Sequence, residues 1–564
     1  MKPIKFFLSE GVKKISSKEK TDKSAFAGVE RKDSSADSSS PPPGYVDAPP
    51  EYDAEDTLDP PDITAGFSKL HIGQPIAHGK PTVAQCIAHL KLLECFYRLR
   101  QTVGSTDRLF GIDEKAVLDS GVDKNEQTPE LLAKLGEKRW AVYVACAVDR
   151  FAAWSAAVAP STGMMTMAQL EQEGPKGTLC EPNSAPPPLE FDANNVPPVD
   201  VLMVWHSYML NPRAYLEDCL RHGRMQLWHT RFPWQAAADC IDSETFAYEA
   251  SMMAESIFAS LTGCSWDSVA STRGKEVQCP GCDSVQTAKW TTCSEHVPTG
   301  VIKSYDELSV AIDSMLASGH GFCDKDFSLT CSCCSTNITH ERLEADKFCS
   351  DVKQLVKNTV PMSGTILGPD GIPFTVGSVT DFQSKYVVRT TNGLLREGLG
   401  DKIVRGARIG EGKCTTESME AVRDMIQLAL KDKGYLQKIR GIATPRMSRG
   451  EKVAIRKMMS RYWDNSCSFA LDLVGAVIRQ GSFVEKMHNI DWLHSPALPS
   501  TMARLITKYD RFMSLMSDKF VFSAVYYFPN RLTLTIRTKG TKWPSRRSTL
   551  TWRGTRTSSI RTRT

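Results

Sequence analysis

Residues 197–215 read Pro-Pro-Val-Asp-Val-Leu-Met-Val-Trp-His-Ser-Tyr-Met-Leu-Asn-Pro-Arg-Ala-Tyr. Two prolines precede an apolar run from Val199 to Met209, and Asn211-Pro212 follows it. Because proline cannot continue a helix, this stretch predicts a short helix that begins at Val199 and ends before Pro212.

Outward from this helix, most of the chain shows helical periodicity. On the N-terminal side we expect helices at 83–100 and at about 129–154, and then a Pro-rich loop at about 160–198. On the C-terminal side we expect helices at 215–222, 243–261, 416–433 and 448–463. The predicted fold is therefore mainly α.

Lys508-Tyr-Asp-Arg-Phe-Met513 echoes Ala147-Val-Asp-Arg-Phe-Ala152. We interpret the echo as a degenerate internal repeat, which makes the predicted fold a helical repeat-like domain with a small inserted module. The predicted divisions are a disordered arm at 1–60, a first helical copy at 65–262, a Cys-rich module at 263–350, a linker and truncated second copy at 351–518, and a basic tail at 519–564.

Three blocks of sequence resemble the glycine-rich domain-containing protein-like family, in its fungal branch. They are Cys86-Ile-Ala-His-Leu-Lys-Leu-Leu-Glu94, the stretch that opens this section, and Phe469 to His488. The resemblance implies an uncharacterised family without a particular reaction. The signature residues that carry it are Asp200, Trp205, His206, Leu210, Asn211, Pro212 and Tyr215.

The first 60 residues are rich in Lys, Ser, Asp and Pro, and we expect them to be disordered because they offer too little apolar surface to bury. They contain two Pro-Pro-x-Tyr motifs, formed by Pro42, Pro43 and Tyr45 and by Pro49, Pro50 and Tyr52. Such segments dock as polyproline helices in aromatic grooves, so we expect WW-domain partners, including those of ubiquitin ligases. The alternative is a Pro-rich solubilising linker.

Nine cysteines lie between Cys264 and Cys349, and two C-x-x-C pairs stand out among them. Two such pairs can present four thiolates to a structural Zn²⁺ in a ribbon-like α+β module. The intervening residues are too many for a compact ribbon, so we expect an inserted helix at 304–318. The predicted ligands are Cys279, Cys282, Cys331 and Cys334, with Cys333, Cys293, Cys323, His296 and His340 as alternates. A redox-inert cluster without metal remains the alternative.

Several other cysteines stand singly in helical patterns, which favours a reducing compartment over a disulfide framework. We expect an intracellular protein, cytoplasmic rather than nuclear. We expect no secretory signal and no membrane span, because no apolar run approaches about 18–20 residues.

The net charge of +4 does not describe the body of the chain, because residues 519–564 contain eleven Lys and Arg and no acidic residue. The rest of the chain carries about −7, so net charge does not favour a nucleic-acid-binding protein.

No catalytic residue is predicted. The chain lacks the nucleophile elbow, the phosphate loop and His-Glu-x-x-His, and no histidine is followed two residues later by Asp or Glu. His206 is more typical of a packed core histidine than of a ligand. Tyr208 also stands where the resembling sequences often carry a second histidine. The leading hypothesis is a zinc-stabilised helical interaction protein; the alternatives are a nucleic-acid-associated protein using the zinc module and a metal-dependent enzyme near His206.

The tail at 519–564 breaks every pattern before it. Consider a shifted reading frame for Lys542 to Arg561, in which each codon joins the last base of one codon to the first two bases of the next. In this frame Trp543-Pro544 must encode alanine. The shifted codons that follow permit a second Trp-His motif like that of the resembling family. We therefore hypothesise a frameshift or retained intron near 518–542, with a genuine basic tail as the alternative.

Overall fold

The computed structural model describes residues 80–120, 128–172, 186–268, 274–296, 302, 304–367, 390–406, 418–440 and 447–523, and three short strands beyond them. The predicted arm at 1–60 and both Pro-Pro-x-Tyr motifs lie outside the described residues. The described chain is mainly helical, as predicted, with few and short strands.

The chain forms two compact units. One contains the described residues from Ile87 to Leu493, and the other combines residues 80–86 with the described residues from His494 onward. In the order of the chain, the larger unit begins with α3 (Val83–Ser105, from its second turn), η1 (Leu109–Gly111), α4 (Lys115–Leu118), α5 (Thr128–Val158), α6 (Met167–Gln172), α7 (Val199–Met209), α8 (Pro212–Arg221), α9 (Met225–His229), α10 (Trp234–Asp239) and α11 (Met252–Thr262).

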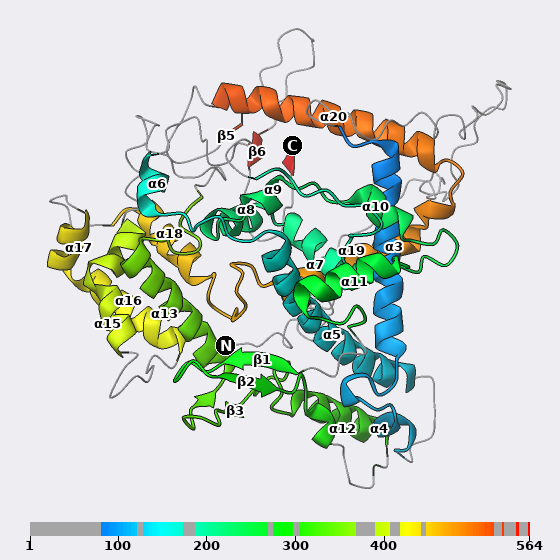
Figure 1. Cartoon of the computed structure of the whole chain (residues 1–564), viewed down its shortest axis with the longest axis horizontal. Coiled ribbons are helices and arrows are strands. Elements are labelled where there is room, and N and C mark those ends of the chain that lie inside the picture. The colour runs from blue at the N-terminus through cyan, green and yellow to red at the C-terminus, as the bar shows by residue number, and fades with distance from the viewer. Residues whose placement is uncertain are drawn as a thin grey trace, which may run out of the picture. The chain divides into compact units, whose positions relative to one another are not determined.

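Figure 1 shows the elements of the larger unit, of which the following come after α11 in the chain. They are β1 (Lys275–Gln278), β2 (Val285–Ala288), η4 (Cys293–His296), α12 (Tyr305–Ala317), β3 (Leu329–Thr330), β4 (Asn337–Ile338), α13 (His340–Asn358), η5 (Leu395–Leu399), α15 (Gly400–Gly406), α16 (Met419–Lys431), α17 (Lys433–Arg440), α18 (Arg449–Met459) and α19 (Leu473–Ile490). A short turn of helix, η6 (Trp492–His494), follows α19.

The predicted helix at 199–209 is present as α7, which packs against α5 and α19 in the largest core cluster. Pro198 takes the N-cap position of α7, and Pro212 occupies the first turn of α8. Because a proline without an N–H fits the first turn of a helix, Asn211-Pro212 both ends α7 and begins α8. The sequence predicted the end of α7 but placed the start of the next helix three residues too late.

The helix predicted at 243–261 is wrong in its first half, since α11 begins only at Met252. The side chain of Asp242 accepts hydrogen bonds from the backbone N–H groups of Glu244 and Thr245, at 3.0 and 2.6 Å. Such Asx turns compete with helical hydrogen bonding. An isolated bridge between Ile241 and Tyr248 closes this turn.

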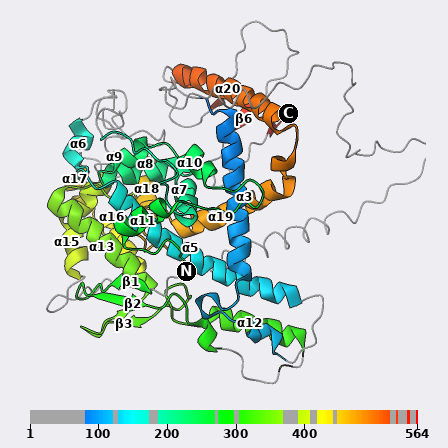
Figure 2. The ribbon, with the colours of Figure 1, turned by 45° about the vertical axis from the view of Figure 1, so that its right-hand side comes forward.

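Helix α13 was not predicted at all, although Thr339 caps it by accepting from the N–H of Arg342. The residues Phe348, Val352 and Leu355 of α13 are buried in a second core cluster, which α15, α16 and α18 complete. Figure 2 shows α13, α15 and α16 gathered at one side of this unit, with the strands β1 to β3 beside them. The boundary predicted at residue 350 falls inside α13.

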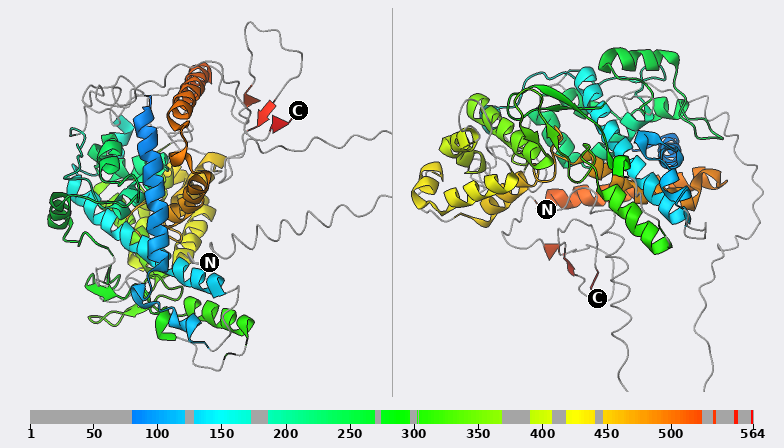
Figure 3. Two further views of the ribbon diagram at one scale, coloured as in Figure 1. Left: turned by 90° about the vertical axis from the view of Figure 1, so that its right-hand side faces the viewer. Right: turned by 90° about the horizontal axis from the view of Figure 1, so that it is seen from below.

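Helices α3 and α5 approach closely at two glycines. A Cβ placed on Gly136 would lie 3.0 Å from the carbonyl oxygen of Gly104. The crossing therefore depends on small residues, and α3 and α5 are visible as the two long neighbouring helices in Figure 3.

By length and composition alone, α5 is apolar enough to cross a membrane. Its most apolar 18-residue window is 56% buried inside the structure, and core helices of soluble proteins pass the same test. This helix also carries Lys138, Arg139 and Arg150, which are buried in ion pairs. The helix is therefore weak evidence on membrane crossing in either direction.

The second unit contains α20 (Leu498–Ser523), which pairs with residues before Cys86 through an ion pair of 2.8 Å between Lys80 and Asp510. Three short antiparallel strands follow in the order β5 (Thr533–Leu534), β6 (Thr549–Thr551) and β7 (Thr562–Arg563). Helix α20 extends to Ser523 and thus passes the residue at which the basic tail was predicted to begin.

Candidate metal centre

The first two cysteines lie in the turn that joins β1 to β2. The N–H of Cys279 donates to the carbonyl of Ser284 at 2.9 Å, and the N–H of Asp283 donates back to the carbonyl of Cys279 at 2.9 Å. Asp283 has a φ of 59°, in the left-handed region that such a tight turn requires. The turn thereby places Cys279 and Cys282 on the same side of the hairpin.

The second pair repeats this geometry between β3 and β4. The N–H of Cys331 donates to the carbonyl of Thr336 at 2.9 Å, and the N–H of Ser335 donates to the carbonyl of Cys331 at 3.0 Å. Ser335 has a φ of 57°, which matches that of Asp283. Two knuckles of the same conformation therefore face each other, about 50 residues apart in the sequence.

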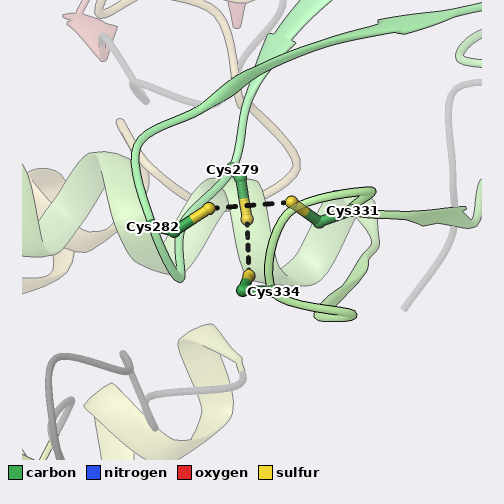
Figure 4. A group of neighbouring side chains, drawn as sticks. All are labelled: Cys279, Cys282, Cys331 and Cys334. Carbon is green, nitrogen blue, oxygen red and sulfur yellow. Dashed lines mark hydrogen bonds between the residues drawn. The ribbon is translucent and has the colours of Figure 1, made fainter.

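The two knuckles bring the four sulfur atoms together, within 4.8 Å of one another (Figure 4). The Sγ atoms of Cys279 and Cys334 are 3.6 Å apart, as are those of Cys282 and Cys331. A disulfide would need about 2.05 Å. Four thiolates about 2.3 Å from a central Zn²⁺ lie about 3.8 Å from each other in a tetrahedron. The cluster thus fits a metal ion that is held by four protein ligands, and all the cysteines in the described residues are free.

Gly281 lets the two knuckles approach. A Cβ at this position would lie 2.6 Å from Oγ1 of Thr336 and 3.2 Å from Sγ of Cys334. Any side chain would therefore push the second knuckle away from the first. The glycine of the spacer between the first two cysteines is thus a packing requirement of the cluster.

Hydroxyl groups flank the sulfur atoms. Ser284 Oγ lies 3.1 Å from Sγ of Cys282 and 3.3 Å from Sγ of Cys331. Its hydrogen bond lowers the pKa of Cys282 and lowers that of Cys331 to about 6, whereas burial raises the pKa of Cys279 to about 12. Oγ1 of Thr336 takes the corresponding place, 3.1 Å from Sγ of Cys334. The motif C-x-x-C-x-Ser/Thr in both knuckles is a sequence signal that pattern reading could have used.

The alternate ligands lie outside the group of four. Cys333 is exposed, and Cys293 is buried among the apolar residues that pack around α12. The His340 ring packs against Phe322 and Phe327, with ring centroids 5.3 and 5.0 Å away, and burial lowers its pKa. Among the described residues, only the four predicted cysteines form a metal-ligand group of three or more.

A buried ion pair fastens the module to α5. Lys138 Nζ lies 2.7 Å from Oδ1 of Asp324, and both side chains are almost completely buried. Asp324 also accepts from the hydroxyl of Thr291 at 2.6 Å and from the N–H of Gly321 at 2.8 Å. Burial alone would raise the pKa of Asp324, but Lys138 and these donors hold it below its ordinary value. The module therefore packs against the helical core with its polar contacts satisfied.

His206 lies in the core, as its position on an apolar helix predicted. Its Nε2 is 3.1 Å from Nε2 of His89, and its ring also packs against Phe96 and Phe232. Burial, together with the charge of a protonated His89, lowers the pKa of His206 to about 3. Both rings are thus neutral at pH 7, and one donates a hydrogen bond to the other. The partner His89 belongs to another of the three signature blocks, and sequence reasoning missed the pair.

Other signature residues form a buried polar network around α7. Trp205 Nε1 donates to the hydroxyl of Tyr215 at 3.1 Å, and that hydroxyl donates to the carbonyl of Leu227 at 2.9 Å. The side chain of Asn211 donates to the carbonyl of Ser207 at 2.9 Å, whereas Leu210 is exposed. Apart from Leu210, these residues serve packing and helix termination.

Two further signature contacts cross between blocks. Tyr208 donates to Asp218, and Oδ2 of Asp218 accepts from the N–H of Ala470 at 2.8 Å. His488 Nδ1 lies 2.8 Å from Oε2 of Glu94. The three blocks that look separate in the sequence therefore converge on one core.

Comparison with known proteins adds no relative: no protein-family model matches the chain, and no curated protein or solved structure matches it. The resemblance to the glycine-rich domain-containing protein-like family therefore stays a prediction. What the geometry defines is a mainly helical chain with a four-cysteine centre that could hold a metal ion.

Proposed function

We propose that the protein is an intracellular interaction protein, in which a structural Zn²⁺ stabilises a module on a helical core and the N-terminal arm recruits WW-domain partners. The observation that carries the proposal is the closed set of four sulfur atoms within 4.8 Å. Four cysteine ligands leave no coordination position for a substrate, which is typical of structural rather than catalytic zinc. The membership of the glycine-rich domain-containing protein-like family is proposed with it.

The histidines support the same conclusion. His206 and His89 satisfy each other within an aromatic core, so the ring nitrogens that face each other are already paired. Two lysines of the described part of the module are already engaged in ion pairs. Lys275 pairs with Asp149 at 2.5 Å, and Lys289 pairs with Glu295 at 2.8 Å. We therefore do not extend the proposal to nucleic-acid binding or to a reaction near His206.

The zinc claim is tested by native mass spectrometry and metal analysis of the purified full chain. We expect one zinc ion per chain, and its loss in Cys279→Ser. The matched control is Cys333→Ser, because Cys333 lies in the same turn but outside the group of four. Retention of zinc in Cys279→Ser, or its loss in the control alone, would contradict the assigned ligands.

The partner claim is tested separately with the full chain and a purified WW domain. Tyr45→Ala combined with Tyr52→Ala should abolish binding, since tyrosine completes each Pro-Pro-x-Tyr motif. Asp47→Asn, which lies between the motifs, is the control and should bind like the native chain. Equal binding by the double variant would refute the recruitment of WW domains and leave the zinc claim standing.

A further inference from the structure

Helix α18 (Figure 1) presents a row of positive side chains to solvent. Arg449, Lys452 and Arg456 follow each other at intervals of three and four residues, and all three are exposed. Residues at this spacing share one face of a helix. Ile455 and Met458 of the same helix are buried in the second core cluster, which fixes the orientation of α18. We call the three exposed cations the basic stripe.

The basic stripe has no counter-charge among the described residues. In the part of the chain that the structure describes, none of its three side chains forms an ion pair, and Arg456 donates only to the carbonyl of Lys452, at 3.3 Å. The single acidic residue of α18, Glu451, is completely buried. It accepts from the N–H of Ser448 at 2.6 Å and from the hydroxyl of Thr390 at 2.8 Å. The described residues therefore leave the charge of the stripe uncompensated.

The preceding helix, α17, has the same sign of charge. Together α17 and α18 contain seven Lys and Arg and one acidic residue, which is the buried Glu451. Lys433 and Lys438 of α17 are exposed. By contrast, residues 1–518 as a whole carry about −7. These two helices are thus a positive region within a negatively charged body.

The N-terminal part of the sequence contains a run of the complementary charge. Between Lys32 and Lys69 there are nine Asp and Glu and no Lys or Arg. Six of the nine fall in residues 51–62, which we call the acidic segment and which lies outside the described residues. They are Glu51, Asp53, Glu55, Asp56, Asp59 and Asp62. The acidic segment overlaps the second Pro-Pro-x-Tyr motif at Tyr52.

The spacing of the charges and the length of the chain allow the two to meet. The basic stripe extends over about 10 Å, since a helix rises about 1.5 Å per residue. An extended chain rises about 3.3 Å per residue and points alternate side chains to one side, so Glu51, Asp53 and Glu55 can offer three carboxylates within about 13 Å.

The chain is also long enough to bring the acidic segment to α18. From Asp56 to Ile87, where the described part of the larger unit begins, the chain can span up to about 90 Å. A unit of this size has a radius of gyration of only about 20 Å. The acidic segment can therefore reach any surface of the larger unit.

We propose that the basic stripe of α18 binds the acidic segment of the same chain and thereby keeps the second Pro-Pro-x-Tyr motif from WW domains. The docking is argued from charge and reach alone, whereas its regulatory consequence rests on the proposed function. A WW domain takes up the prolines and the tyrosine of such a motif in its groove. Because Tyr52 lies within the docked segment, docking and WW binding exclude each other.

A tethered segment has an advantage over a free polyanion at this surface. Its effective concentration is on the order of mM, because the chain cannot diffuse away. A nucleic acid in solution has no such advantage, and the net charge of about −7 on the body of the chain repels it. Exposed ion pairs are individually weak and are screened by salt, so the contact should be lost at high ionic strength.

Carbodiimide cross-linking of the purified full chain, followed by peptide mass spectrometry, tests the docking. This reagent joins a lysine amine to a carboxylate only where the two groups are in contact. We expect Lys452 to be linked to residues 51–62 at about 50 mM salt, and at least tenfold less at about 500 mM salt. The link between Lys289 and Glu295, which form an ion pair at 2.8 Å, is the internal positive control.

The combination of Arg449→Glu and Arg456→Glu reverses two charges of the basic stripe and leaves Lys452 as the reporter. We expect this stripe variant to lose the cross-link to the acidic segment at least tenfold. Lys486→Glu is the matched control, because Lys486 is an exposed lysine on α19 of the same unit, and it should keep the native cross-link.

Reversing the charge of the segment as well provides a rescue. Asp53→Arg combined with Glu55→Arg should restore the cross-link in the stripe variant, because the charges are then exchanged between the two sides. Absence of the cross-link in the native chain, or an undiminished one in the stripe variant, would overturn the docking.

Two other occupants are distinguished by the same variant. Cross-links that join isotope-labelled to unlabelled chains in a mixture would assign the basic stripe to a second copy and overturn the proposal. Binding of a fluorescent oligonucleotide that the stripe variant loses, without the cross-link to the acidic segment, would assign the stripe to a nucleic acid and also overturn it.

A purified WW domain tests the regulatory consequence, with Tyr45→Ala in every chain so that only the second motif can bind. We expect the stripe variant to bind the WW domain at least threefold more tightly than the chain with the native stripe, and Lys486→Glu to change nothing. Equal affinities in the presence of the cross-link would overturn the regulation and leave the docking. Absence of WW binding in every chain would refute the proposed function, and the cross-link would still decide the docking.

Discussion

The ion pair between Arg150 and Asp200 gives the most direct test of how α7 is held on α5. Both side chains are buried, and Nε lies 2.6 Å from Oδ2. The substitution Asp200→Ala removes the carboxylate and leaves the guanidinium of Arg150 in the core. Arg150 keeps the carbonyls of Ser265 and Trp266 as acceptors, the latter at 2.7 Å, but loses its counter-charge.

The expected cost follows from burial. Removing one partner of a buried pair costs about 3–5 kcal/mol, because the remaining charge stays uncompensated. An exposed pair is worth about 1 kcal/mol or less. Lys289 and Glu295 form such a pair, with 73% and 54% of their side chains exposed. Glu295→Ala is therefore the matched control.

Urea unfolding, monitored by tryptophan fluorescence, measures the loss in the free energy of unfolding of each variant. The fluorescence reports on this core because Trp154 and Trp205 lie in it, with ring centroids 5.2 Å apart. We expect a large decrease in the midpoint for Asp200→Ala and almost none for the control. A loss below about 1 kcal/mol in Asp200→Ala would refute the view that this pair is desolvated.

Two further predictions concern the metal centre and pH. Gly281→Ala should lower the zinc content of the purified chain, because the added Cβ would lie 2.6 Å from Oγ1 of Thr336; Gly434→Ala, whose Cβ would make only an ordinary contact, should keep native zinc content. Burial lowers the pKa of His206 to about 3. Between this pH and about 6.5, the ordinary pKa of histidine, the unfolded chain therefore binds a proton at His206 that the folded chain does not bind. Stability should therefore fall as the pH drops below about 6.5, by about 2 kcal/mol at pH 5 from this group alone. Urea unfolding at pH 7 and 5 should show a smaller pH effect in His206→Gln, and an unchanged one would contradict the buried neutral ring.

Local sequence patterns predicted many of the helices. The periodicity at 83–100 and 129–154 predicted α3 and α5, and Ser304 predicted the start of α12, whose N-cap it is. Two elements were missed for local reasons. Thr339 caps α13 within a strongly polar sequence, and the Asx turn at Asp242 delays α11.

The sequence by itself determined the composition of the four-cysteine centre, because the C-x-x-C spacing already places two sulfur atoms of each knuckle together. It also determined the ends of α7, since proline acts on its own neighbours in the chain.

Only the tertiary structure decided which distant groups meet. The contact of His89 with His206, the burial of Arg150 against Asp200 and the fastening of Asp324 to Lys138 join residues 50 to 186 positions apart. Helix periodicity reports which face of an element is apolar, but it does not report which other face will cover it. That choice depends on the packing of the whole core.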